Sequence, residues 1–353
     1  MSIYKGLFTP YSLNRKLTEQ EKRDQLYQGQ PHPDNPLVSN DDTVIKMNST
    51  YLETIDRYYT FKGFPSLISF LMAMVFFVFL ICFCITYFYR YFLQNEPLES
   101  GDEYLIVFCI ILGSFAVYAT SSVVLKEWFR KTHYPIRFNR KTQMIYVYQV
   151  NGKILEAPWN SIFFTLYDGR RGMPGGWGID GHILAEDKET VLQTFSLGVY
   201  DSKVNIPGYW EFIRCYMEEN VLDEMHKTIF LCPPVSEKKE NHIYGLQYIL
   251  RVDSKWDWLY NLLLIPYHLI ESVSRYIAMQ TSKIPQWPED VEKKCVVASD
   301  DPIDVSDKNN IPYIWRYFSA NLKMKDHLKY YKQQMIAVKR IRRRVNNRHN
   351  TQE

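Results

Sequence analysis

Two long uncharged runs early in the chain constrain its fold more than any other feature. The first lies between Lys62 and Arg90, and the second lies between Glu103 and Lys126. As helices, both exceed the roughly 30 Å hydrocarbon thickness of a bilayer at about 1.5 Å of rise per residue. Soluble cores seldom contain two adjacent runs this long without a charge. We therefore predict a transmembrane hairpin over residues 63–131, with spans at about 65–89 and 104–126.

Charges around the runs predict the orientation of the hairpin. The connector carries Arg90 and four acidic residues, whereas the flank after the second run is basic: Lys126, Arg130, Lys131, Arg137, Arg140 and Lys141. Positive residues stay on the cytoplasmic side, so we expect both termini to be cytoplasmic. No charge lies inside either run, which favours an anchor over a transporter or proton relay. A channel formed by oligomerisation remains an alternative.

The sequence lacks the motifs of the common catalytic and metal sites. There is no His-Glu-x-x-His, paired Cys-x-x-Cys, Gly-x-Ser-x-Gly or nucleotide-loop pattern, and the eight histidines are scattered. None of the six cysteines falls in the predicted outer connector, so no disulfide framework is expected. We predict a non-enzymatic protein without cofactor or metal.

After the second run the hydrophobic pattern changes to the period of two that is typical of β-strands. The strand-like runs are residues 136–139, 143–149, 153–157, 162–167, 178–185 and 190–197. Asn151-Gly152 is a strong hairpin turn. Pro207 then opens a helical pattern in which Trp210, Ile213 and Met217 recur at intervals of three and four residues. We expect a β domain over 132–225, a meander capped by one amphipathic helix.

Two further segments lie on the cytoplasmic side. Residues 1–62 form a polar N-terminal segment, whose part from Asn40 to Thr60 is regular enough to be helical. Residues 226–310 contain a linker and a helical region. The apolar stretch Trp256–Ala278 is interrupted by charges and by Pro266, which would kink it, so it is not a third span. Packing on the β domain and lying in the inner membrane interface are both consistent with it.

The glycine-rich loop of residues 169–178 is a candidate partner-binding site. It places Trp177 near Arg170 and Arg171, and exposed aromatic and arginine side chains are favoured at protein interfaces. The alternative is that Trp177 covers the mouth of the β domain. No Gly-Lys-Ser/Thr follows the loop, so it is not a nucleotide loop.

The tail, residues 311–353, is predicted to be a basic helix. From Arg316 onward it holds 11 Lys and Arg residues and only two acidic ones. The candidate membrane-surface residues are Lys339, Arg340, Arg342, Arg343 and Arg344. Anionic lipid attracts such charges, and so does nucleic acid, although we expect no nucleic acid partner for a membrane-anchored chain. An acidic protein partner and a plain solvated helix end are the alternatives.

The β domain resembles the pleckstrin-homology-like (PH-like) domains that follow helical hairpins in bacterial membrane proteins. The resemblance is carried by Arg137-Phe138-Asn139-Arg140, by Trp159-Asn160-Ser161-Ile162 and by the closing helix. It implies a small antiparallel β-barrel with a capping helix. The expected fold is therefore an α+β membrane protein: a two-helix transmembrane hairpin, the PH-like β-barrel and a helical C-terminal region.

The whole chain resembles bacterial two-span proteins encoded beside type VI secretion effectors. The stretches that carry this resemblance are Asn40–Glu53, Lys283–Glu292 and Asp300-Asp301-Pro302. The resemblance implies a multi-pass immunity protein of the bacterial inner membrane that binds and neutralises a cognate, membrane-targeting toxin. The alternative is a membrane-tethered scaffold or adaptor whose PH-like domain recruits a cytoplasmic protein or a lipid headgroup.

Overall fold

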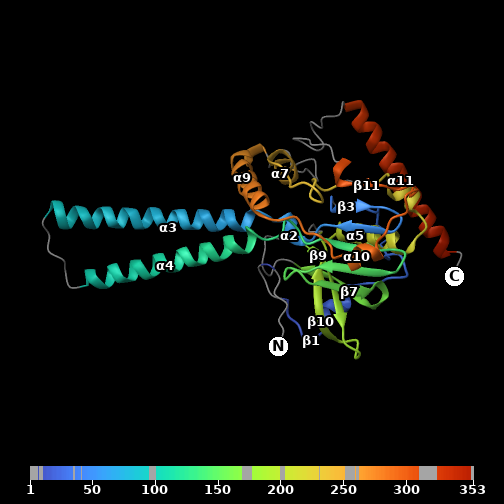
Figure 1. Ribbon diagram of the computed structural model, residues 1–353, viewed down its shortest axis with the longest axis horizontal. Coiled ribbons are helices and arrows are strands. Elements are labelled where there is room, and N and C mark those ends of the chain that lie inside the picture. Colours follow the sequence, from blue (N-terminus) through green and yellow to red (C-terminus); the bar gives the residue numbers. More distant parts are fainter. Residues whose placement is uncertain are drawn as a thin grey trace.

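A long apolar hairpin projects from a body built on two β-sheets (Figure 1). The computed structural model describes residues 7, 11–34, 36–40, 42–94, 101–168, 177–198, 203–229, 231–250, 259, 262–309 and 324–350. The hairpin consists of α3 (Phe64–Phe88), a π-helical continuation η1 (Tyr89–Leu93) and α4 (Asp102–Glu127). Both helices cover the predicted spans, because their apolar runs contain no charge and their one proline, Pro65, lies in the first turn of α3, where a helix tolerates it.

The larger sheet has six antiparallel strands in the order β11-β3-β4-β5-β6-β7. Its strands are β11 (Val305–Ser306), β3 (Val44–Met47), β4 (Tyr51–Thr54), β5 (Ile136–Asn139), β6 (Met144–Tyr148) and β7 (Ile154–Pro158). The expected helix over Asn40–Thr60 is wrong for most of its length. Val44–Met47 and Tyr51–Thr54 are strands because Asn48 turns the chain between them: its Oδ1 accepts hydrogen bonds from the Thr50 and Tyr51 amides at 2.9 and 2.8 Å.

The smaller sheet has five antiparallel strands in the order β1-β10-β9-β8-β2. Its strands are β1 (Arg15–Lys16), β10 (Thr190–Ser196), β9 (Trp177–Leu184), β8 (Ile162–Asp168) and β2 (Gln25–Leu26). The two edge strands flank the short helix α1 (Glu19–Arg23), whose N-cap Thr18 forms a capping box with Glu21. Residues 1–62 and 226–310 thus contribute strands that lie outside the predicted limits of the β domain, 132–225.

The two sheets do not close into the predicted β-barrel. Between β7 and β8 the chain passes through a 3-10 turn, η2 (Trp159–Ser161), from one sheet to the other. Short strands from distant parts of the chain take outer positions in both sheets: β1 and β2 in the smaller and β11 in the larger. These short strands form hydrogen bonds with backbone groups at the sheet edges, which in a closed barrel would bond to each other.

Helix α5 (Ile206–Glu218) confirms the helix predicted to begin near Pro207, but it is not a surface cap. Every residue from Ile206 to Met217 is buried. Trp210 stacks on Trp159, with ring centroids 5.6 Å apart, in the main core that both sheets share. Ile341 and Val345 of the tail helix belong to the same core. The tail therefore helps to bury α5, and α5 is a core helix.

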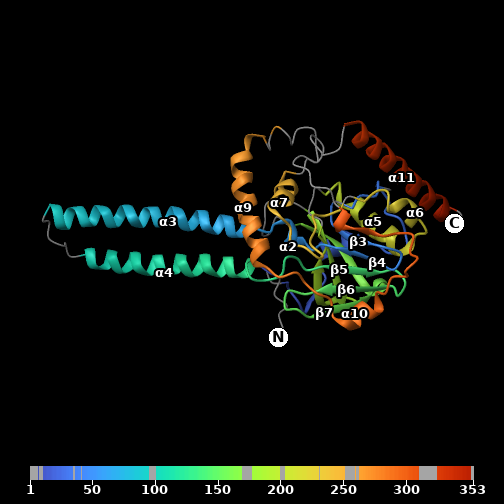
Figure 2. The same cartoon turned by 45° about the horizontal axis from the view of Figure 1, so that its top comes forward.

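The other helices surround the sheets and the base of the hairpin (Figure 2). They are α2 (Arg57–Thr60), α6 (Leu222–Met225), α7 (His242–Ile249), α9 (Ile265–Thr281), α10 (Glu289–Lys294), a short η4 (Asp307–Asn309) and α11 (Met324–Asn350). Pro266 occupies the first turn of α9 and so begins that helix instead of kinking it. Figures 1 and 2 place α9 against the base of α3 and place α11 at the end of the body opposite the hairpin.

Candidate groove and buried junction

The hairpin exposes a large apolar surface. Its two helices, Phe64–Leu93 and Tyr104–Glu127, are long and apolar enough to cross a membrane, and their most apolar windows are not buried by the rest of the protein. Met72 and Val75, for example, are 70% and 69% exposed. Each buried Å² of apolar surface contributes roughly 25 cal/mol, so this surface strongly favours apolar surroundings.

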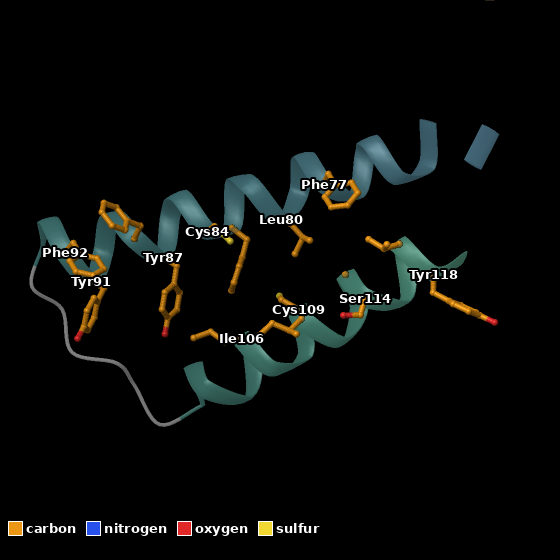
Figure 3. Close-up of a pocket in the computed structure, with 15 residues that line it drawn as sticks. Phe77, Leu80, Cys84, Tyr87, Tyr91, Phe92, Ile106, Cys109, Ser114 and Tyr118 are labelled. Atoms are coloured by element: carbon orange, nitrogen blue, oxygen red, sulfur yellow. The ribbon is translucent and has the colours of Figure 1, made fainter. Parts of the chain in front are cut away.

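A groove of about 960 Å³ lies between α3 and α4 (Figure 3). Fifteen residues line it: Phe77, Leu80, Phe83, Cys84, Tyr87, Phe88, Tyr91, Phe92, Ile106, Cys109, Ile110, Gly113, Ser114, Val117 and Tyr118. A Cβ on Gly113 would lie 3.4 Å from Leu80 Cδ1, so the helices approach each other closely there. Figure 1 shows the two helices diverging from the base toward the connector.

The chemistry of the groove restricts what it can bind. None of the lining residues is charged, and the polar side-chain groups are four hydroxyls and two thiols. Tyr87 extends from α3 toward α4, and Cys84 and Cys109 come from opposite walls (Figure 3). Small residues on a wall allow another helix to approach closely in a membrane. The groove therefore suits an apolar helix with a few hydrogen-bonding groups.

Glu127 ties the end of α4 to the start of α3. It is 1% exposed, and its carboxylate accepts hydrogen bonds from the Gly63 amide and from the Ser66 amide at 3.0 Å. An anion at this place satisfies the first free amides of α3 and complements the positive end of the helix dipole. Lys62 Nζ donates to the carbonyls of Lys131 and Glu127 at 2.8 and 3.3 Å. These contacts join both helices at the base of the hairpin.

Arg275 of α9 forms the second part of this junction. Its Nε and Nη2 donate to the Glu240 carboxylate at 2.7 and 2.9 Å, and both side chains are 1% exposed. Its Nη1 donates to the carbonyls of Tyr59 and Lys62 at 3.0 and 3.3 Å. The guanidinium also lies 4.7 Å from the ring centroids of Tyr59 and Tyr248. Arg275 thus connects α2, α7 and α9 next to the start of α3.

Burial shifts the ionisation of groups around the junction. It lowers the pKa of Lys62 to about 8, although Glu127 opposes this shift. Burial, with a smaller contribution from the charge of nearby Lys62, lowers the pKa of His133 to about 3. Burial raises the pKa of Asp56 to about 6, against hydrogen bonds from the Tyr134 and Tyr58 amides. His133 is therefore neutral at physiological pH.

Replacing His133 by Asn is expected to remove part of the acid sensitivity of the protein. The pKa of His133 is about 3 in the folded protein and about 6.5 in the unfolded chain. Between these pH values the imidazole is protonated only in the unfolded chain, so His133 lowers the stability of the protein as the pH falls. At pH 5 this loss is about 2 kcal/mol relative to pH 7.5. The Asn side chain keeps a partner for the Thr132 hydroxyl, which lies 3.0 Å from His133 Nδ1.

The measurement is thermal unfolding of the detergent-solubilised full chain at a series of pH values. Asp56 acts with the opposite sign, since its raised pKa weakens the protein as pH rises from about 4 to about 6. Because Asp56 and Lys62 are present in both proteins, the difference between the two profiles isolates His133. Parallel profiles from pH 7.5 to 5 would contradict the assignment.

A polar layer between β9 and β10 contains serine, histidine and aspartate but not in the arrangement of a Ser-His-Asp triad. Ser196 Oγ donates to Asp180 Oδ1 at 2.5 Å, whereas His182 Nδ1 contacts Thr194 Oγ1 at 2.8 Å. The cross-strand register pairs Ser196 with Asp180 and Thr194 with His182, so the serine is not hydrogen-bonded to the histidine. Among the described residues, no group of three or more His, Cys, Asp or Glu is placed to hold a metal ion.

The structure locates some of the predicted site residues. Trp177 is half-buried at the start of β9 and packs against the main core, and the Lys203 ammonium lies 4.4 Å from its ring centroid. Arg170 and Arg171 lie outside the described residues. Of the three residues predicted to bind a partner in this loop, the structure therefore describes only Trp177, and the partner-binding role stays a prediction.

The basic tail residues lie on α11, at the end of the body opposite α3 and α4 (Figure 1). Arg340 pairs with Glu224 at 3.2 Å and Arg344 with Asp223 at 2.7 Å, which holds the helix on α6. The other three predicted cations, Lys339, Arg342 and Arg343, are exposed. These three residues therefore lie on the side of the body that faces away from the hairpin.

Sequence reasoning missed Glu127, Gly63 and the role of Arg275. A signal for Glu127 was available, since it is an acidic residue inside an otherwise basic flank. In the sequence, Arg275 is only one of the charges that interrupt the apolar stretch Trp256–Ala278. Its partner Glu240 lies in the segment that the sequence predicts to be a linker. No local sequence pattern indicates that Glu240 and Arg275 form an ion pair.

Comparison with known proteins gives one match. The model of a family described as a family of unknown function, DUF6708, matches residues 114–299, which run from the middle of α4 to just beyond α10. No curated protein and no solved structure matches the chain.

Proposed function

The chain belongs to the family of unknown function DUF6708, and from that premise we propose that it is an immunity protein of the bacterial inner membrane. In this proposal α3 and α4 cross the membrane, the body faces the cytoplasm, and the protein binds and neutralises a membrane-targeting toxin of a type VI secretion system. The β part would be a PH-like domain in an open, extended form.

The groove between α3 and α4 is the observation that carries the proposal. The groove is apolar, has a volume of about 960 Å³, and lies between helices that diverge toward the connector, which this orientation places on the outer side. A toxin segment that inserts from outside would meet the open end first. Binding there would remove the segment from toxin assemblies, and this requires no catalytic group in the immunity protein.

Filling the groove is expected to reduce protection by at least about tenfold, the effect of a loss of roughly 1.4 kcal/mol in binding. The variants are Cys84→Trp and Cys109→Trp, whose side chains come from opposite walls. The matched control is Met74→Trp, because Met74 is 58% exposed and is not one of the residues that line the groove. The candidate toxin is the product of the adjacent gene, directed to the periplasm of a sensitive bacterium that also produces the full chain.

Survival is measured by colony counts, with the membrane level of each variant checked by immunoblotting. Protection by the wild type and by Met74→Trp, but not by the groove variants, would support the proposal. Equal protection by all four proteins would show that the toxin does not bind in the groove. If the toxin kills equally well when the wild-type protein is present, the proposed immunity function is wrong.

One observation favours a second candidate, a membrane-tethered scaffold or adaptor. Lys339, Arg342 and Arg343 are exposed on the side of the body that faces away from the hairpin. There they would meet an acidic cytoplasmic protein more readily than the headgroups of the membrane that holds α3. Recovery of a cytoplasmic partner with the wild type, but not after Arg342→Glu and Arg343→Glu, would support this function.

A further inference from the structure

Helix α9 is amphipathic, but most of its apolar residues face outward and its polar residues face inward. A helix on the surface of a water-soluble protein normally has the opposite arrangement. Most of its exposed side chains are apolar: Leu269 (45% exposed), Ile270 (55%), Val273 (50%), Tyr276 (40%) and Ile277 (36%). The exposed polar one is Gln280, in the last turn. Its buried side carries four polar residues, His268, Ser272, Ser274 and Arg275, beside Ala278 and Met279 near its end. The exposed face of α9 therefore requires apolar surroundings.

Contacts of the polar side fix α9 against the start of α3. Ser274 Oγ donates to the Gly63 carbonyl at 2.7 Å and lies 3.3 Å from Ser66 Oγ. Arg275 is held by Glu240 next to it. Figure 2 shows α9 running across the axis of α3 at the base of the hairpin. A helix in this position lies parallel to any bilayer that α3 crosses.

The apolar face of α9 continues the lipid-facing surface of the hairpin. Ile68 and Phe70 at the start of α3 are 37% and 45% exposed, and Leu125 near the end of α4 is 55% exposed. Exposed cations surround this zone: Lys126, Arg130 and Lys283. Apolar side chains flanked by Lys and Arg are typical of helices that lie in a membrane interface, where the cations meet anionic headgroups.

We propose that α9 lies in the boundary between headgroups and acyl chains of the leaflet next to the body, with Leu269, Ile270, Val273, Tyr276 and Ile277 in contact with lipid. It acts as an in-plane support that sets the height of the body above the bilayer. This inference rests on the membrane insertion of α3 and α4 in the proposed function, but not on toxin binding.

The test is lipid photolabelling of the full chain. The protein is reconstituted in vesicles of phosphatidylethanolamine and phosphatidylglycerol that contain a phospholipid with a diazirine in its acyl chain. After irradiation and digestion, labelled peptides are identified by mass spectrometry. We expect label on peptides from α3, α4 and α9. Helix α11 is the matched control, because it also exposes an apolar residue, Ile336 (49% exposed), but lies far from the hairpin.

The variant Ile270→Ser/Val273→Ser/Ile277→Ser is expected to reduce labelling of α9 by about fivefold or more, because it removes most of the exposed apolar area. Labelling of α3 and α4 should not change, and Ile336→Ser should change nothing. Label on α3 and α4 without label on α9 would overturn this inference alone. Absence of label from all three helices would overturn the membrane insertion on which it rests.

Discussion

Replacing Arg275 by Met is expected to lower the free energy of unfolding by about 3–5 kcal/mol. The substitution leaves the Glu240 carboxylate buried without its cation. Tyr59 Oη still donates to that carboxylate at 2.5 Å, but the two bonds from Arg275 and the positive charge are lost. The carbonyls of Tyr59 and Lys62 also lose their donor. An isolated buried charge costs far more than a neutral group of similar size.

A double-mutant cycle separates the ion pair from simple loss of packing. The double variant Arg275→Met/Glu240→Gln removes both charges. Its loss of free energy of unfolding is therefore expected to be smaller, by at least about 1 kcal/mol, than the sum of the losses of the two single variants. The control pair is Glu289 and Lys293, whose side chains are 93% and 78% exposed. Lys293→Met should change stability by less than about 0.5 kcal/mol.

Chemical or thermal unfolding of the detergent-solubilised full chain is a suitable measurement. A cost for Arg275→Met no larger than that for Lys293→Met would show that the buried pair does not hold the junction together. The same result would also weaken the case for α9 as a fixed support, since Arg275 is its main polar attachment.

The elements that the sequence predicted well depend on local patterns. The two apolar runs became α3 and α4, and the period-two runs between residues 136 and 197 became β5 to β10. Asn151-Gly152 does form the turn between β6 and β7, with Gly152 at φ +82°. In each case the residues that decide the structure are neighbours in the sequence.

The elements that the sequence missed depend on pairing over long distances. Strands β1, β2 and β11 are two residues long, too short to show any period. They form only because β10, β8 and β3 offer free edges. The prediction of a closed barrel failed for the same reason, since local patterning does not reveal which strand will take the edge of a sheet.

Helix α9 illustrates a further limit of sequence reasoning. The sequence shows that Trp256–Ala278 is an apolar stretch interrupted by charged residues, but it does not show which side of a helix would be buried. Packing on the body was one interpretation and the membrane interface was the other. The structure has the polar face inward because Glu240 and the start of α3 offer partners for Arg275 and Ser274.

Replacing Gly63 by Ala is expected to cost more than about 3 kcal/mol, because it combines two penalties. Gly63 has φ +93°, a left-handed conformation that costs an alanine roughly 1–2 kcal/mol. Its new Cβ would also lie 2.4 Å from Arg275 Cα and 2.5 Å from Arg275 N. These are backbone atoms, so relief of the contact requires α9 to move away from α3 as a unit.

Gly152→Ala is the matched control for this prediction. Gly152 has a similar φ of +82°, but a Cβ there would meet no atom within 4 Å. This variant should therefore show only the backbone penalty of about 1–2 kcal/mol. Unfolding of both variants in detergent gives the comparison, and lipid photolabelling reports whether α9 has moved. Equal costs for the two variants would mean that α9 is not packed closely on the start of α3. A larger cost at Gly63, with changed labelling of α9, would show that one glycine joins the hairpin to its in-plane support.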